Sequence, residues 1–188
     1  MPKAWRVIDL INWAESYFKE KGFENPRREI EWLLRDVLKC DRMDVYLRFE
    51  ESLSKSQLDV IRSWVKRRIK HEPLQYITGS CEFYGQRLLV NKHVMIPRPE
   101  TERLLDTVLD KVKGRVSPSI LDVGTGSGCI ALILGLEIPG STILGIDISS
   151  SALNVANENK KKLATQNVYF EKLNILEQFP SGEFDLLV

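Results

Sequence analysis

The stretch Ile120-Leu-Asp-Val-Gly-Thr-Gly-Ser-Gly128 decides the fold of this chain. Its first four residues form a mainly apolar run that predicts a strand, and the apolar residues after Gly128 predict a helix. The three glycines between them permit a tight turn and let a ligand lie against bare backbone. The amide groups at the start of the helix point toward such a ligand.

The segments after this turn continue to alternate between strand and helix. Apolar runs predict strands at residues 142–146, 168–172 and 184–188, and an amphipathic pattern predicts a helix at residues 150–163. This order implies a parallel sheet with helices on its faces. We therefore predict an α/β fold with a Rossmann-like sheet.

Asp147 ends the strand that follows the turn, and it indicates what the turn binds. A carboxylate at this place can accept hydrogen bonds from both hydroxyls of an adenosine ribose. The alternative is an aspartate that caps the next helix, a task that Ser149 and Ser150 can also perform.

The glycine spacing separates two classes of cofactor. A dinucleotide fingerprint, Gly-x-Gly-x-x-Gly/Ala, would end at position 129, where this chain has Cys129, and no Gly-Lys-Ser/Thr of a Walker loop follows. S-adenosylmethionine has no pyrophosphate, but its ammonium needs an acceptor, which Asp122 and the turn carbonyls can supply. The spacing favours S-adenosylmethionine, although a turn that only connects a strand to a helix would look similar.

The chain before the α/β part divides into two further segments. Apolar residues at helical spacing predict a small bundle of three or four helices in residues 1–73. Within it, Asn25 before Pro26 predicts a helix start, and residues 54–57 predict a capping box. Residues 74–97 contain two β-prone runs around a glycine, which predict a β-hairpin linker, and residues 98–188 form the α/β domain.

Composition limits the classes of partner. The chain has 188 residues, and its 27 basic and 26 acidic side chains give a net charge of +1, without the basic excess of a dedicated nucleic-acid binder. Three isolated cysteines and two histidines make a metal site or a disulfide framework improbable and fit a reducing compartment. No apolar run resembles a signal peptide or a membrane span. We expect a cytoplasmic monomer with no metal, membrane or direct nucleic-acid partner.

Four motifs in order carry a family resemblance. They are Glu72-Pro-Leu-Gln-Tyr-Ile-Thr-Gly79, Glu82-Phe-Tyr84, Ile96-Pro-Arg-Pro-Glu-Thr-Glu102 and the glycine turn. Together they closely resemble the HemK/PrmC family, the peptide chain release factor glutamine methyltransferases. The resemblance runs from the helical start to Val188, and its Pro-Arg-Pro-Glu-Thr-Glu segment is far more specific than the turn.

The resemblance implies a fold and an activity. The family has an N-terminal helical substrate-recognition domain, joined by a β-hairpin to a class I S-adenosylmethionine-dependent methyltransferase domain. It transfers a methyl group to the glutamine side-chain amide in the Gly-Gly-Gln motif of release factors, in translation termination. The release factor is thus the expected partner and protein substrate.

The resemblance also implies roles for single residues. The turn would hold the methionine part of the cofactor, Asp147 the ribose and Ile148 the adenine face, with Asn174 and Ile175 at the adenine edge. The family often has an acidic residue where this chain has Asn174, whose amide can both donate and accept. The expected cofactor-binding residues are Asp122, Gly124, Thr125, Gly126, Ser127, Gly128, Asp147, Ile148, Asn174 and Ile175. Arg98 and Glu100 are expected at the substrate entrance, or else in a rigid linker that starts a helix.

The catalytic signature of the family is Asn-Pro-Pro-Tyr, directly after the fourth strand. The 188 residues end with that strand, and none of them matches the role. We therefore expect a C-terminally incomplete methyltransferase domain, an exposed apolar sheet edge, no catalytic residue in this chain, and an inactive fragment. Two alternatives stay open, namely a methyltransferase for amino groups of nucleic acids and a non-catalytic module that binds S-adenosylmethionine or a partner.

Overall fold

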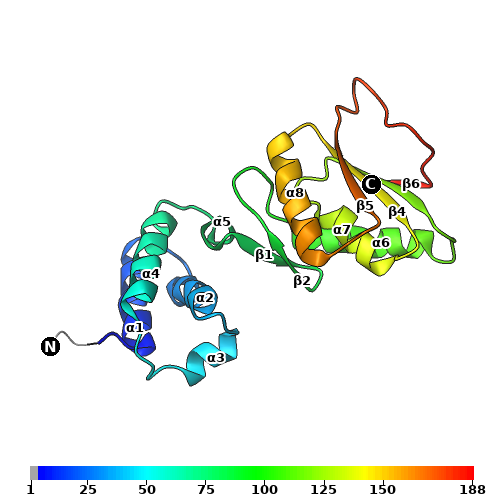
Figure 1. Cartoon of the computed structure of the whole chain (residues 1–188). Helices are drawn as coiled ribbons and strands as arrows, with labels where there is room; N and C mark the ends of the chain where they lie inside the picture. The colour runs from blue at the N-terminus through cyan, green and yellow to red at the C-terminus, as the bar shows by residue number, and fades with distance from the viewer. Residues whose placement is uncertain (1–3) are drawn as a thin grey trace. The chain divides into compact units, whose positions relative to one another are not determined.

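The computed structural model describes residues 4–188 and divides the chain into two compact units (Figure 1). Unit 1 ends at Thr78 and unit 2 comprises Gly79–Val188. The sequence placed the first boundary after residue 73. The division comes later because the short helix α5 (Leu74–Thr78) packs against two helices of unit 1.

Unit 1 is helical. Its elements are α1 (Val7–Glu20), α2 (Pro26–Leu38), α3 (Arg42–Leu47), α4 (Lys55–Arg68) and α5. Their apolar faces meet in one core around fully buried side chains such as Phe18, Ile30 and Leu34. Burial of such side chains is the main stabilising contribution in a bundle of this size.

The two helix starts predicted in this part have different outcomes. Ser54 accepts a hydrogen bond from the Gln57 amide, and the Gln57 side chain accepts one from the Ser54 amide, so the capping box at α4 is confirmed. Pro26 occupies the first turn of α2, but Asn25 forms no side-chain cap, so that part of the prediction is wrong. Proline without a backbone donor suffices to start this helix.

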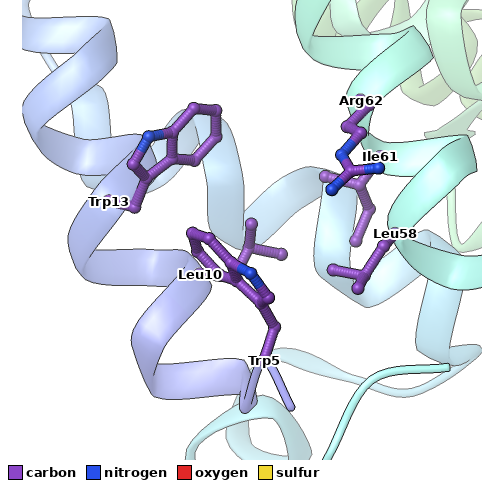
Figure 2. A pocket seen from close by; sticks show the side chains of 6 residues that line it. All are labelled: Trp5, Leu10, Trp13, Leu58, Ile61 and Arg62. Carbon is purple, nitrogen blue, oxygen red and sulfur yellow. The ribbon is translucent and has the colours of Figure 1, made fainter. Parts of the chain in front are cut away.

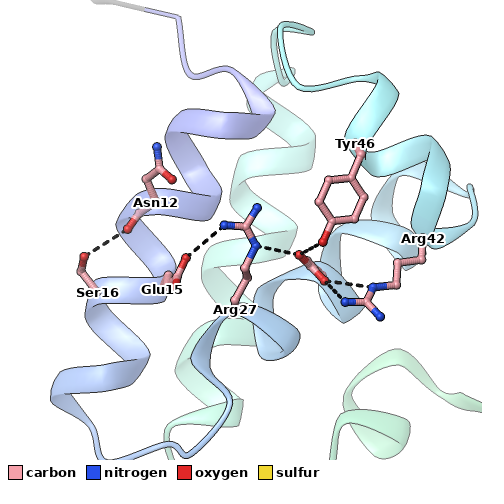
Figure 3. A network of polar contacts seen from close by, with 7 residues as sticks. Asn12, Glu15, Ser16, Arg27, Arg42 and Tyr46 are labelled. Carbon is pink, nitrogen blue, oxygen red and sulfur yellow. Dashed lines mark hydrogen bonds and ion pairs between the residues drawn. The ribbon is translucent and has the colours of Figure 1, made fainter.

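A buried carboxylate connects α2 to α3 (Figure 3). The Glu31 side chain is 3% exposed and accepts hydrogen bonds from Tyr46 Oη at 2.6 Å, Arg27 Nε at 3.0 Å and Arg42 Nε at 3.2 Å. Burial alone raises the pKa of Glu31, but the bonds from Tyr46 and Arg27 outweigh it and lower the pKa below its ordinary value. Glu31 therefore stays ionised and paired inside the bundle.

Unit 2 contains a hairpin and a parallel sheet. Its elements are β1 (Ser80–Phe83), β2 (Gln86–Leu89), α6 (Pro99–Val112), β3 (Ser119–Val123), α7 (Cys129–Glu137), β4 (Thr142–Asp147), α8 (Ser150–Leu163), β5 (Val168–Lys172) and β6 (Leu186–Leu187). The larger sheet has the order β5-β4-β3-β6, with every pairing parallel. The predicted α/β order is confirmed.

The connections of the sheet place its helices. The chain steps from β3 to β4 and from β4 to β5 in one direction, so right-handed crossovers put α7 and α8 on the same face. The most apolar helix is α7, which packs on β4 and β5 and also contacts α6 and α8. This helix begins directly after the glycine turn, so its burial fixes the turn at the edge of the sheet.

The last strand is shorter than predicted. β6 contains Leu186 and Leu187 only, whereas the apolar pattern predicted residues 184–188. Asp185 and Val188 lie outside the strand, although their amides still donate to the Ser119 and Leu121 carbonyls, and the Asp185 carboxylate accepts from the Ser119 amide at 2.9 Å and from Arg115 at 2.8 Å. β6 pairs with β3 at the edge of the sheet, where Leu187 is 53% exposed.

The predicted hairpin is present and is bound to unit 2. Tyr84 and Gly85 both have positive φ angles, of 48° and 70°, as a two-residue type I′ turn requires. The Tyr84 amide donates to Glu102 of α6 at 2.8 Å, and the Tyr84 hydroxyl donates to Asp106 at 2.8 Å. These bonds make the hairpin part of the unit that carries the sheet.

Among residues 4–188, no helix combines the length and the apolar character needed to cross a membrane.

Candidate functional site

The carboxyl ends of three parallel strands meet at one edge of the sheet. β3 ends at Val123, directly before the glycine turn, β4 ends at Asp147, and β5 ends at Lys172. Open α/β sheets bind their ligands outside this edge. The candidate site predicted from the sequence therefore lies at the edge where sheets of this kind bind their ligands.

Asp147 lies directly against the glycine turn. Its Oδ2 accepts a hydrogen bond from the Gly126 amide at 3.0 Å, and its Oδ1 accepts one from the Ser149 amide at 2.8 Å. Ser149 caps α8 through its own side chain, so Asp147 is not needed as the helix cap. The next residue, Ile148, is 67% exposed and adds an apolar surface beside the carboxylate.

The first and last glycines of the turn have different tasks. Gly124 has a φ of +75°, and a side chain built there would meet nothing within 4 Å, so open space lies in front of it. Gly128 has a φ of +79°, and a Cβ there would lie 2.8 Å from Phe170 Cζ and 3.2 Å from Ala156 Cβ. Gly124 thus leaves room for a ligand, whereas Gly128 lets the turn pack closely on α8 and β5.

Asp122 supports the turn from inside the fold. Its side chain is almost fully buried, and its Oδ2 accepts from the Thr125 hydroxyl at 2.6 Å and from the Ala131 amide at 3.2 Å. Burial raises the pKa of Asp122 to about 6. The sequence suggested Asp122 as an acceptor for the cofactor ammonium, but the partners in the structure are groups of the turn and of α7.

The two hydroxyl residues of the turn are also buried. Thr125 is 4% and Ser127 is 2% exposed, and the Thr125 hydroxyl is engaged by Asp122. We therefore expect any ligand contact at these two positions to come from the backbone. Thr125 fits here because Gly145 of β4 lies beneath it, where a Cβ would come within 2.7 Å of the Thr125 hydroxyl oxygen.

The remaining predicted site residues lie in two places. Asn174 follows β5, where its amide donates to Glu177 at 2.8 Å and accepts from the Leu176 amide at 3.2 Å. Asn174 and Ile175 are half-buried, and the Leu173 amide bonds to the Asp147 carbonyl, which places this segment beside the turn. Arg98 and Glu100 are exposed at the start of α6.

Two further residues, Gly145 and Asn159, support the turn although no sequence motif indicates them. Gly145 interrupts a β-prone run, which commonly marks a close backbone approach. Asn159 is fully buried and follows Ala152, Val155 and Ala156 on the buried face of α8. A polar residue at an apolar position of a helix was the signal that could have found it.

Unit 1 has a concave feature of its own (Figure 2). A cavity of about 200 Å³ opens between Trp5 and α1 on one side and α4 on the other. It is lined by Trp5, Leu10, Trp13, Leu58, Ile61 and Arg62. Trp13 is 43% exposed and stacks nearly parallel on Tyr17, with ring centroids 5.3 Å apart.

Metal and thiol chemistry receive no support from the described part of the chain. Residues 4–188 hold no cluster of three His, Cys, Asp or Glu side chains that could bind a metal ion. Burial raises the pKa of Cys129, beside the glycine turn, to about 12, so this thiol stays protonated and is a poor nucleophile.

Comparison with known proteins matches both units. The family model described as the PrmC N-terminal domain matches residues 9–79, and one described as a methyltransferase domain matches residues 116–188. Together with the parallel sheet, the second match confirms the predicted class I methyltransferase fold.

Three curated relatives bear the name release factor glutamine methyltransferase. The relative from Chlorobaculum tepidum is 38% identical over 99% of this chain and 67% of its own length. The Geobacter sulfurreducens relative is 36% identical over 100% of this chain and 65% of its own, and that of Buchnera aphidicola is 45% identical over 87% and 59%. The chain thus spans about two thirds or less of these relatives.

The buried Asp122 carboxylate predicts a specific pH dependence. Its pKa rises from 3.8 in the unfolded chain to about 6 in the folded one, so folding takes up a proton between these values and stability falls as pH rises through them. Asp122→Asn keeps an acceptor oxygen but removes the titration. Between pH 4 and pH 7, the free energy of unfolding of the unsubstituted chain should therefore fall by about 2 kcal/mol relative to that of Asp122→Asn.

All four tryptophans lie before residue 79, so their fluorescence does not report on unit 2. Hydrogen exchange of β3 and α7 peptides, with and without denaturant, measures the stability of unit 2, which contains Asp122. A constant difference between the two proteins across this pH range would contradict the assignment of a raised pKa to Asp122.

Proposed function

This chain belongs to the release factor glutamine methyltransferase family, and we propose that it binds S-adenosylmethionine at the glycine turn for methyl transfer to a release factor. The proposed acceptor is the side-chain amide of the glutamine in the Gly-Gly-Gln motif. The observation that carries the cofactor assignment is the contact between Asp147 and the turn, with Gly126 N and Asp147 Oδ2 3.0 Å apart. It puts a carboxylate directly beside the glycine turn, at the edge where open α/β sheets bind their ligands.

The hydrogen-bonding capacity of Asp147 matches an adenosine ribose. Each carboxylate oxygen offers about two acceptor sites. Each oxygen of Asp147 accepts one backbone hydrogen bond, from Gly126 or from Ser149, which leaves one acceptor site on each. Two free sites on neighbouring oxygens suit the 2′ and 3′ hydroxyls of a ribose.

The surroundings of Asp147 suit the other parts of the cofactor. Exposed Ile148 offers an apolar surface for the adenine ring. The Asn174 segment lies next to the same strand end, where amide groups can reach the ring edge. The open space at Gly124 accommodates the methionine part, and the buried Asp122 holds the turn in shape while the ligand binds.

The reaction sets clear demands on the protein. When bound, S-adenosylmethionine supplies a methyl group on a sulfonium centre. An amide nitrogen is a weak nucleophile, because its lone pair is delocalised into the carbonyl, so it has to be held in line with the methyl in a site with little water. We assign to Asp147 and the glycine turn the binding and orientation of the donor. We assign no acceptor-holding role within residues 1–188, which contain no Asn-Pro-Pro-Tyr sequence.

We assign recognition of the release factor to unit 1. This unit presents a cavity with two tryptophans, and Trp13 remains 43% exposed in spite of its size. Large exposed aromatic side chains beside a pocket are typical anchors of protein interfaces. The match of residues 9–79 to the PrmC N-terminal domain supports a role of unit 1 that is separate from cofactor binding.

Asp147→Ala should weaken S-adenosylmethionine binding by about 1–3 kcal/mol, because charge-assisted hydrogen bonds to the ribose are lost. Calorimetry measures the affinity, and Asp110→Ala, an exposed carboxylate on α6, is the matched control. Because Asp147 also holds the turn, an S-adenosylhomocysteine analogue without the 2′ hydroxyl isolates the direct contact. The unsubstituted chain should discriminate against this analogue, and Asp147→Ala should not; equal discrimination by both would place the ribose elsewhere.

The activity is tested by methyl transfer from labelled S-adenosylmethionine. We expect the 188-residue chain to bind the cofactor but to leave the release factor unmethylated, whereas the Chlorobaculum tepidum relative methylates the Gly-Gly-Gln glutamine under the same conditions. RNA and DNA acceptors are included to detect activity toward nucleic acid. Labelled glutamine with the 188-residue chain alone would refute its inactivity, and labelled nucleic acid would refute the proposed substrate.

The docking role of unit 1 predicts that Trp13→Ala weakens release factor binding at least fivefold without changing cofactor affinity. The reason is loss of an exposed aromatic anchor at the cavity. Val60→Ala on α4 is the control, since Val60 is 41% exposed but does not line the cavity. Surface plasmon resonance gives the affinities, and equal binding by Trp13→Ala and the control would exclude this cavity as the contact.

A further inference from the structure

Asn159 of α8 is a fully buried amide that binds only backbone groups of other segments. Its Oδ1 accepts from the Leu89 amide at 2.6 Å, and its Nδ2 donates to the Leu89 carbonyl at 3.0 Å and to the Ser127 carbonyl at 3.0 Å. A side-chain amide has two N–H donors, and both are used here. The orientation of the amide is thereby fixed, because a flip would set its NH₂ group against the Leu89 amide.

The two bonds to Leu89 copy the pairing of a neighbouring strand. Leu89 is the last residue of β2, whose other edge is paired with β1. Asn159 satisfies both the donor and the acceptor of Leu89, as a residue of a third strand would. Lys162, the next residue on this side of α8, donates to the Arg87 carbonyl, so the helix covers the open edge of β2 at two points.

The third bond reaches the proposed cofactor site. Ser127 belongs to the glycine turn and is buried. Asn159 of α8 holds it by donating to its backbone carbonyl. One turn earlier on α8, Ala156 lies against Gly128, where a Cβ would come within 3.2 Å of the Ala156 Cβ. The same face of α8 therefore supports both the turn and the hairpin.

The hairpin is also fastened at its far end. Glu102 of α6 accepts from the Tyr84 amide, and Asp106 accepts from the Tyr84 hydroxyl. The hairpin is therefore a short, stiff element held between α6 and α8. A displacement of the hairpin acts directly on Asn159 and, through it, on Ser127.

We propose that Asn159 is a positioning residue that couples the β1–β2 hairpin to the glycine turn, so that cofactor binding and hairpin order depend on each other. This inference rests on the proposed function, since it takes the turn as the cofactor site. The coupling is reciprocal: a ligand that orders the turn also orders Leu89, and a contact that holds the hairpin raises cofactor affinity. It gives a protein that touches the hairpin a direct route to the methyl-donor site.

Hydrogen exchange with S-adenosylhomocysteine as the probe measures the coupling in the unsubstituted chain. We expect the ligand to slow exchange in peptides of the turn, residues 122–131, and at least threefold in peptides of the hairpin, residues 80–90. In Asn159→Ala the hairpin should lose this protection, and the affinity for the ligand should fall at least tenfold. A purely structural role of Asn159 would change stability without producing ligand protection at the hairpin.

Asn157→Ala is the matched control. It makes the same substitution two residues away on the same helix, but Asn157 is exposed and its amide bonds only to the Leu153 carbonyl of α8. We expect this variant to keep the hairpin protection and an affinity within twofold of the unsubstituted chain. Turn protection without hairpin protection in the unsubstituted chain would overturn the coupling.

Two further experiments distinguish failure of the proposed cofactor from failure of the proposed coupling. If the ligand protects neither segment, the proposed cofactor is wrong, and the coupling is decided without ligand: Asn159→Ala must then accelerate exchange of the turn and the hairpin together, relative to Asn157→Ala. If Asn159→Ala does not fold, the double variant Glu102→Ala/Asp106→Ala removes both bonds at the other end of the hairpin without touching α8. Unchanged exchange of the turn in this double variant would then overturn the proposal.

Discussion

The hydrogen bonds of the buried Asp122 carboxylate are the interaction on which the α/β unit depends. One oxygen at the end of β3 accepts from the Thr125 hydroxyl and from the first turn of α7, so it bends the chain back over the strand. Burying this carboxylate is unfavourable, as its raised pKa shows, and the two donors offset part of the cost. With the turn held from inside, the space in front of Gly124 stays open.

Unit 1 also has a buried carboxylate that joins two secondary-structure elements, namely Glu31 between α2 and α3. Glu31 lies in a bundle of short helices, where it gathers Tyr46, Arg27 and Arg42 around one carboxylate. Burial raises the pKa of both carboxylates, but at Glu31 the hydrogen bonds from Tyr46 and Arg27 and the charges of Arg42 and Arg27 outweigh it. At Asp122 burial dominates, because the two donors there are a hydroxyl and a backbone amide.

The hairpin is more than a linker, because hydrogen bonds attach it to two helices of unit 2. Its type I′ turn is a local feature, but its attachment to α6 through Tyr84 and to α8 through Asn159 is tertiary. In a family whose reaction brings together a small cofactor and a large protein, an element joined to the glycine turn through Asn159 is well placed to connect the two proposed binding events. Asn159 is the residue through which such a connection passes.

Sequence patterns alone predict the α/β order, the hairpin, the helical first part, and the pairing of a glycine turn with an acidic residue at the next strand end. These features depend on local spacing, because periodicity and turn chemistry act between residues close in the chain. They did not predict the length of β6, or that Asn25 forms no side-chain cap at α2.

The hydrogen-bond partners of Asp122 and Asn159 are known only from the folded structure. The sequence suggests Asp122 as an acceptor for the cofactor ammonium, and the structure adds that its Oδ2 accepts from protein donors beneath the turn. Asn159 bonds to residues 70 and 32 positions away, and no local pattern names such partners. The physical reason is that the partners of a buried polar group are set by how helices and strands pack, whereas the sequence encodes only the need for partners.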